Sequence, residues 1–184
     1  MRVKLLASAT LMAAPFMLLG AYANATEFSA KLVGFEELPA VFSKGSGTLD
    51  LDLNRNARTI TFKLTFSGLS APVTQSHIHF GKRHVAGSVT VFFCGSLTNP
   101  GPAGTQLCPA GGGTVTGTIT GANVLAITAQ AMPAGDFDAL VTLLETHTAY
   151  ANVHTTNFPA GEIRGQIRRG DRDDDRKDRD DDRR

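Results

Sequence analysis

The chain has 184 residues, of which 42% are hydrophobic and 19% are charged, and its formal net charge at pH 7 is +1. Acidic and basic residues are evenly mixed over the main body, which argues against a nucleic-acid-binding domain. Residues 26–168 are sufficient for a domain that buries its own hydrophobic core, and we predict one folded domain over this range.

The first residues have the pattern of a secretory signal peptide. Two basic residues precede an apolar run over residues 5–20, and small residues at Ala23 and Ala25 offer cleavage sites. We predict cleavage after Ala25 or Ala23, so that residues 1–25 form the signal and the mature protein is secreted or periplasmic. A retained N-terminal membrane anchor is the alternative, because the apolar run is nearly long enough to span a bilayer. No segment after the cleavage site is apolar enough to cross.

Short segments in which apolar and polar residues alternate fill most of the chain that follows. Residues 48–53 and 59–66 alternate almost perfectly around a turn at residues 54–57, which predicts a β-hairpin with one face in water. Further strands are predicted at residues 28–35, 73–80, 88–93, 113–120, 149–154 and 162–168. Regular strand spacing, with Gly and Pro between the strands, predicts an all-β fold, an antiparallel Greek-key sandwich or barrel.

The two cysteines, Cys94 and Cys108, enclose a segment rich in Gly, Pro, Ser and Thr. Because an exported protein meets an oxidising environment, we predict that they form a disulfide. A loop of this length should stabilise the fold by ~3 kcal/mol in the chain-entropy model. Nucleophilic chemistry is the alternative, but neither cysteine has a base beside it in the sequence.

One stretch near residues 136–146 has the periodicity of a helix rather than of a strand. The apolar residues at this spacing are Phe137, Leu140, Val141 and Leu144, and Asp136 before them is a suitable N-cap. We predict a short helix whose apolar face packs against the β-domain.

The C-terminal tail, residues 169–184, contains a tandem seven-residue repeat of acidic and basic residues at 171–177 and 178–184 and has no apolar residue. A segment of this kind cannot bury a core, so we predict that it is disordered. Counted from Arg168, its eight acids and eight bases cancel, which makes it a polyampholyte. Calcium binding by the Asp triplets is the alternative, and the interleaved arginines oppose it.

Three histidines lie on two of the predicted strands. His77 and His79 are separated by one residue, so their side chains point to the same face of a strand. On a later strand, His154 shares a face with Asn152. Three converging imidazoles suit copper or zinc if their nitrogens lie within ~4 Å of one another around a metal with ~2 Å bonds. The alternative is structural: the rings donate hydrogen bonds to Glu162, Asn152 or backbone carbonyls and fix the strand register.

Four blocks of sequence resemble the CHRD (chordin) domain and together span nearly the whole predicted domain. They are Glu37-Leu38-Pro39, His77-Ile78-His79-x-Gly81, Tyr150-Ala151-Asn152-Val153-His154-Thr155 and Pro159-Ala160-Gly161-Glu162-Ile163-Arg164-Gly165-Gln166. The resemblance implies an extracellular β-domain of the kind found in chordin and in many bacterial secreted proteins. It marks Glu37, Pro39, Asn152, Glu162 and Arg164 as family-motif residues.

A more distant similarity is to copper-zinc superoxide dismutase, a Greek-key barrel whose copper is held by an H-x-H strand and a later V-H strand. The predicted fold is therefore immunoglobulin-like or superoxide-dismutase-like. The similarity implies His77, His79 and His154 as copper ligands and places Arg164 where that family has an anion-guiding arginine. It does not extend to a zinc site, because no cluster of His and Asp follows His79.

The functional expectation rests on these residues. We find no paired carboxylates, activated nucleophile or phosphate-binding loop in the residue spacing. We therefore expect a non-enzymatic binding or structural module with an unidentified extracellular or periplasmic partner. The alternative is a copper-binding metalloprotein that uses His77, His79 and His154, in which case copper is its cofactor.

Overall fold

The alternating segments of the sequence form the strands of one antiparallel sheet. In β2 (Ser46–Asn54) and β3 (Thr59–Ser67), every second residue is buried and those between are mostly exposed. The other strands are β1 (Ala25–Val33), β4 (Val73–Phe80), β5 (Ser88–Cys94), β6 (Gly113–Ile119), β7 (Ala149–Thr155), β8 (Ile163–Gln166) and β9 (Arg168–Arg169). This computed structural model describes residues 25–170, and the predicted signal peptide and tail lie almost entirely outside the described residues.

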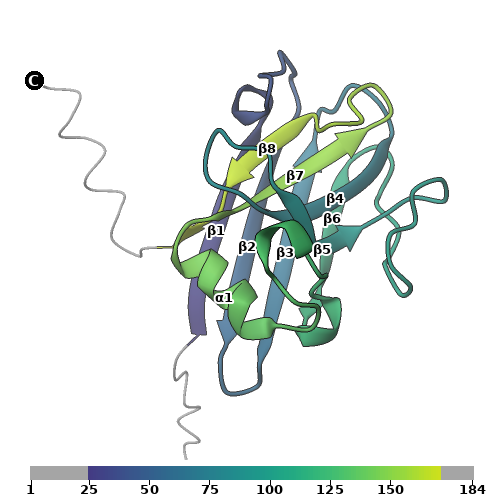
Figure 1. Ribbon diagram of the computed structural model, residues 1–184. Helices are drawn as coiled ribbons and strands as arrows, with labels where there is room; N and C mark the ends of the chain where they lie inside the picture. Colours follow the sequence, from purple (N-terminus) through teal and green to yellow (C-terminus); the bar gives the residue numbers. More distant parts are fainter. Residues whose placement is uncertain (1–24, 171–184) are drawn as a thin grey trace, which may run out of the picture.

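The sheet curls into a nearly closed barrel, as Figure 1 shows. Its strand order is β5-β4-β7-β8-β1-β2-β3-β6, and the two edge strands, β5 and β6, approach each other. In the loop between them, the Nε2 atom of Gln106 donates hydrogen bonds to Phe93 O (3.2 Å) and Thr116 O (3.0 Å). Gln106 thus bridges the edges, where unpaired backbone groups would otherwise invite pairing with another chain. The prediction of an antiparallel sandwich or barrel is confirmed.

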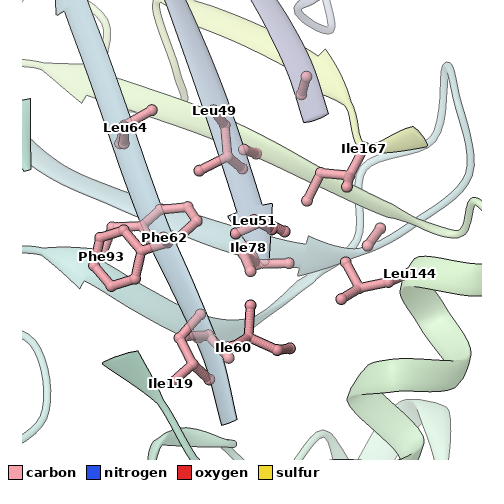
Figure 2. Packing of buried hydrophobic residues seen from close by; sticks show 14 of the residues in the cluster. Leu49, Leu51, Ile60, Phe62, Leu64, Ile78, Phe93, Ile119, Leu144 and Ile167 are labelled. Atoms are coloured by element: carbon pink, nitrogen blue, oxygen red, sulfur yellow. The ribbon is translucent and has the colours of Figure 1, made fainter. Parts of the chain in front are cut away.

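The hydrophobic core fills the interior of the barrel. Figure 2 shows side chains from β2, β3, β4, β5 and β6 meeting there, and among them Leu49, Leu64 and Ile78 have no exposed surface. Each fully buried side chain of this size stabilises the fold by roughly 1.5–3 kcal/mol. The inward residues of each strand therefore form the core, and the outward residues are available for other roles.

The predicted helix is present as α1 (Phe137–Glu145) and covers one end of the barrel (Figure 1). Asp136 is its N-cap, since Asp136 Oδ1 accepts a hydrogen bond from Ala139 N (2.9 Å). The predicted apolar residues of the helix are buried: Phe137, Leu140, Val141 and Leu144. In the described part of the chain, no helix has the length and apolar character needed to span a membrane.

The structure differs from the predicted elements at a few ends. The first strand stops at Val33 instead of residue 35, because the chain turns into a short 3₁₀ helix, η1 (Gly34–Glu36). Two further 3₁₀ turns, η2 (Gly121–Asn123) and η3 (Thr128–Gln130), were not predicted. The last predicted strand is divided, since β8 pairs mainly with β7 whereas β9 pairs with β1. This pairing continues to Arg169, one residue into the segment predicted as the tail.

The disulfide between Cys94 and Cys108 is present. Cys94 is the last residue of β5, and Cys108 lies in the loop that leads to β6. Cys108 N also donates a hydrogen bond to Gly95 O (2.7 Å). The bond therefore closes the loop that carries Gln106 against the edge of the barrel.

Candidate metal centre

Two neighbouring strands bring the three predicted histidines together. β4 and β7 are antiparallel partners, with His77 opposite Asn152 and His154 opposite Gln75. Because side chains alternate along a strand, His77, His79 and His154 lie on one face, whereas Ile78 and Val153 point to the other face and into the core. The histidines are therefore on the outer face of the barrel wall.

The cluster is compact and shielded from water. One ring nitrogen from each of His77, His79 and His154 lies within 4.8 Å of the others. The ring centroids of His77 and His154 are 4.8 Å apart, and the edge of the His77 ring also packs on Phe92. The exposed fractions are 2% for His77 and 7% each for His79 and His154. The other two histidines, His84 and His147, are exposed and lie outside the cluster.

Backbone carbonyls determine which nitrogen of two rings carries a proton. His79 Nδ1 lies 2.9 Å from Gly87 O, and His154 Nδ1 lies 2.9 Å from Pro159 O. A carbonyl oxygen only accepts hydrogen bonds, so each Nδ1 is the donor. In the neutral imidazole, the other nitrogen, Nε2, then holds a free lone pair. This arrangement, with one nitrogen anchored on a carbonyl, is typical of histidines that bind metal through the other nitrogen.

In His77 the anchored nitrogen is Nε2 instead of Nδ1. Its Nε2 lies 2.7 Å from Gln75 Oε1, to which it donates, and its Nδ1 is buried without a hydrogen-bond partner. An unpaired buried polar atom costs about 1–3 kcal/mol and calls for an explanation. A metal ion bound at His77 Nδ1 would supply one.

Asn152 adds an oxygen to the same cluster. Asn152 Oδ1 lies 3.0 Å from His79 Nε2 and 3.0 Å from His154 Nε2. Because Nδ1 of both rings donates to a carbonyl, each Nε2 can donate to Asn152 Oδ1 only if the ring is protonated on both nitrogens. Protonation of both rings would supply the missing protons, but it would place two cations in a buried site.

The pKa values of the histidines oppose that protonation. Burial, with the neighbouring His154 and His79, lowers the pKa of His77 to about 2. Burial also lowers the pKa of His79 to about 4, although its hydrogen bond to Gly87 acts in the other direction. The pKa of His154 is lowered by burial as well, with partial compensation from its bond to Pro159. The three rings are therefore neutral at physiological pH and available as ligands.

The spacing of the nitrogens is slightly wider than a bound metal requires. Two ligands with bonds of about 2 Å can be separated by at most about 4 Å. The 4.8 Å limit of the cluster therefore implies an inward movement of roughly 0.8 Å when metal binds. Imidazole ligands suit copper and zinc, and divalent copper is bound most tightly of the first-row metals by a given nitrogen site.

A buried carboxyl group lies next to Asn152. Glu37 is 5% exposed, and burial raises the pKa of its carboxyl to about 7, although Arg164, the Leu38 N–H and the Asn152 amide each lower it in part. A β-carbon added at Gly161 would lie 2.3 Å from Glu37 Oε1 and 2.9 Å from Asn152 Nδ2. Gly161, which has a φ of +130°, therefore lets Glu37 and Asn152 pack closely.

Arg164 is buried beside the histidine cluster. It is 3% exposed, and its Nη2 donates hydrogen bonds to Lys82 O (3.2 Å) and Val85 O (2.9 Å). Its guanidinium lies over the ring of Tyr150, at 3.4 Å from the centroid, and Tyr150 stacks on His79. Arg164 is thus buried and bound to loop carbonyls, and the anion-guiding role implied by the similarity to superoxide dismutase stays a prediction.

The remaining motif residues support the loops around the cluster. Glu162 accepts hydrogen bonds from Ser43, Ser70 and Thr155, and these bonds lower the pKa of its carboxyl although burial acts to raise it. Among the described residues, no hydrogen bond joins Glu162 to the histidines. Pro39 is exposed and lines an apolar cleft of about 510 Å³ together with Phe42, Phe158 and other residues of the two adjoining loops.

Sequence reasoning missed the groups that orient the rings. The structural alternative named Asn152 and backbone carbonyls as partners of the rings, but not which carbonyls, Gly87 O and Pro159 O. The contacts of Gln75 with His77 and of Tyr150 with His79 were not predicted. Backbone carbonyls leave no trace in side-chain patterns. The one sequence signal for these partners was the turn around Pro159, which follows β7, the strand that carries His154.

Comparison with known proteins gives one match. The family model described as the CHRD domain matches residues 28–167, a range that contains both histidine strands and all the motif residues above. No curated protein and no solved structure matches the chain.

Proposed function

Because the chain belongs to the CHRD domain family, whose domains are in general extracellular or periplasmic, we propose that it is an exported, non-enzymatic binding module that holds a copper ion. The ligands are His77 Nδ1, His79 Nε2 and His154 Nε2. The predicted signal peptide over residues 1–25 supports export.

The observation that carries the proposal is the pattern of hydrogen bonds in the cluster. One nitrogen of each ring is held by an acceptor, Gln75, Gly87 O or Pro159 O, and one nitrogen of each ring lies within 4.8 Å of the others. The second nitrogens of His79 and His154 both lie 3.0 Å from one oxygen, Asn152 Oδ1, whereas the buried Nδ1 of His77 has no hydrogen-bond partner. A cation bound among the three rings would give His77 Nδ1 a partner.

Copper is favoured over other metals by the ligand type. Neutral imidazoles are borderline ligands that bind copper and zinc, and the stability order of the divalent ions peaks at copper. The burial of the three histidines supports a role in storing copper or in stabilising the fold over a role in catalysis, because a substrate would have to reach the metal. Arg164, the residue that would attract an anion on the superoxide-dismutase analogy, is occupied with loop carbonyls.

The test is metal analysis of the mature protein purified from the compartment to which it is exported. We expect close to one copper per chain in the wild type and none in the His77→Ala/His79→Ala variant. The matched control is His84→Asn/His147→Asn, which also removes two histidines; both are exposed, and Asn tolerates their positive φ of 61° and 54°. The control should bind copper as the wild type does.

Thermal unfolding provides an independent readout. Copper at 100 times its dissociation constant should stabilise the wild type and the control by about 2.7 kcal/mol and leave the double variant unchanged. Circular dichroism of the metal-free proteins shows whether each variant is folded. Equal copper content in the wild type and a folded double variant would refute the site and leave a purely structural role for the histidines.

A further inference from the structure

We propose that the amide oxygen of Asn152 is a fourth ligand of the metal, so that the site consists of three imidazole nitrogens and one neutral oxygen. This inference rests on the proposed copper binding and assigns a role to a residue type that is an uncommon copper ligand. It is carried by the position of Asn152 Oδ1 relative to the two Nε2 atoms.

The distances match those between ligands of one metal. Asn152 Oδ1 is 3.0 Å from His79 Nε2 and 3.0 Å from His154 Nε2. Two ligands bound to the same ion at about 2.1 Å in a tetrahedral arrangement are separated by about 3.4 Å. Nδ1 of both rings already donates to a backbone carbonyl, so Nε2 can also donate to Asn152 Oδ1 only if the ring is a cation. A metal ion bound between Oδ1 and the two Nε2 atoms would satisfy all three atoms while both rings stay neutral.

The surroundings of Asn152 hold its oxygen toward the histidines. Asn152 is 2% exposed, and its amide nitrogen faces the carboxyl of Glu37, whose charge it stabilises. Gly161 lets this contact form, since a side chain there would collide with both groups. An ionised carboxylate can only accept hydrogen bonds, so in that state Glu37 favours the orientation of Asn152 with its amide nitrogen toward Glu37 and its oxygen toward the histidines.

The competing arrangement has the amide rotated by half a turn. Asn152 Nδ2 would then donate its two protons to the two Nε2 atoms and act as a plug in the metal-free site. The two arrangements predict opposite effects of removing the side chain. If Oδ1 is a ligand, Asn152→Ala weakens copper binding; if Nδ2 is a plug, the same change removes a competitor and strengthens it.

The experiment is a competition titration of the mature protein with Cu(II) against a chelator of known affinity, combined with electron paramagnetic resonance. We expect Asn152→Ala to bind Cu(II) at least about tenfold more weakly than the wild type, and Asn152→Asp, which keeps an oxygen in place, to bind at least as tightly as the wild type. The matched control is Asn157→Ala, an exposed asparagine on the adjoining loop, which should leave affinity unchanged. The copper spectrum should keep its imidazole nitrogen couplings in all these variants and shift its main copper coupling in Asn152→Ala.

The binding of Cu(I) adds a second measurement. A neutral oxygen is a poor ligand for the softer Cu(I), so the loss of affinity in Asn152→Ala should be larger for Cu(II) than for Cu(I). Unchanged or tighter Cu(II) binding in Asn152→Ala, with an unchanged spectrum, would overturn the assignment while leaving the three-histidine site intact. A wild-type protein that binds no copper would overturn the proposed function together with this assignment. If Asn152→Ala does not fold, the near-isosteric Asn152→Asp variant decides the question through its spectrum, which must change if the oxygen is a ligand.

Discussion

The carboxyl group of Glu37 is buried, so its ionised form destabilises the fold. Its side chain is almost fully buried, its Oε1 atom has no hydrogen-bond partner, and burial raises the pKa of the group to about 7. The neighbouring Glu36 behaves in the opposite way, because its hydrogen bond to Arg83 lowers its pKa. Two adjacent glutamates thus have opposite electrostatic effects on the stability of the fold.

Replacement of Glu37 by Gln should stabilise the metal-free protein above pH 7. The cost of the ionised carboxyl is absent below an unfolded-state pKa of 4.5 and is complete above the folded-state pKa of about 7. The stability of Glu37→Gln relative to the wild type should therefore rise by roughly 3 kcal/mol between pH 4.5 and pH 8. Urea unfolding of both proteins at several pH values measures this difference.

The control for that prediction is Glu36→Gln. The lowered pKa of Glu36 means that its contribution is stabilising above pH 4.5 and is lost as the pH falls, so this variant should be less stable than the wild type at neutral pH. A pH-independent difference between Glu37→Gln and the wild type would contradict the assignment of a raised pKa to Glu37.

At the scale of single residues, the sequence predicted the histidine cluster better than its surroundings. The spacing of His77 and His79 on a strand, and the alternation of Asn152 and His154, were enough to place all four on one face. The partners of the rings were not predictable, because Gly87 O and Pro159 O belong to loops whose paths depend on the whole fold. The partners of Arg164 were not predictable for the same reason, because the sequence pattern indicates its strand and its face but not the loop carbonyls to which it donates.

The helix α1 contacts the barrel in two ways, through buried apolar side chains and through exposed ion pairs, and these differ in strength. Its apolar side chains enter the core, whereas its polar side chains form exposed ion pairs, Arg58 with Asp138 and Arg55 with Glu145, which reach from the β2–β3 turn. Exposed pairs of this kind contribute about 0–1 kcal/mol each, less than burial of a single leucine. The start of the helix depends instead on the Asp136 cap.

Removal of the cap should cost more than removal of an ion pair on the same helix. Asp136→Ala leaves the N–H of Ala139 without its 2.9 Å acceptor, and we expect a loss of about 1 kcal/mol in the free energy of unfolding. Asp138→Ala, two residues later, removes an exposed partner of Arg58 and should cost less than about 0.5 kcal/mol. Chemical denaturation of both variants gives the comparison, and equal losses would show that the cap does not stabilise the helix start.

Strands and helix were predictable because each has a regular period that burial imposes on the sequence. The hairpin of β2 and β3 alternates through its entire length, and α1 repeats its apolar residues every three or four positions. The division of β8 from β9 has no such signal. Both β8 and β9 pair with β1 in one register, and the strand is interrupted at Ile167, whose N–H donates to Ala149 O of β7. Such an interruption is a property of the assembled sheet.

For the molecule as a whole, the weakest part of the barrel wall is the contact between its edge strands. β5 and β6 are not joined by a continuous ladder, and Gln106 bridges them from a loop that the Cys94–Cys108 disulfide holds in place. Loss of the disulfide therefore affects both the entropy of the unfolded chain and the closure of the barrel.

Replacement of both cysteines by Ala should lower the free energy of unfolding by about 3 kcal/mol, as the chain-entropy model gives for a loop of this length. Opening of the edges should also make the variant more prone to self-association, which light scattering measures at increasing protein concentration. The wild type treated with a reductant should reach the same stability as the variant. A reduced wild type as stable and as monodisperse as the oxidised form would show that the loop closes the edges without help from the disulfide.

The placement of the three histidines on the outer face of β4 and β7 has a consequence for how this barrel can change in evolution. Ile78 and Val153 pack in the core, while His77, His79 and His154 occupy the alternate positions of the same strands. Substitutions of the outward residues therefore leave the packing of the inward residues in place. Selection can remove or replace the histidines without altering the interior of the barrel.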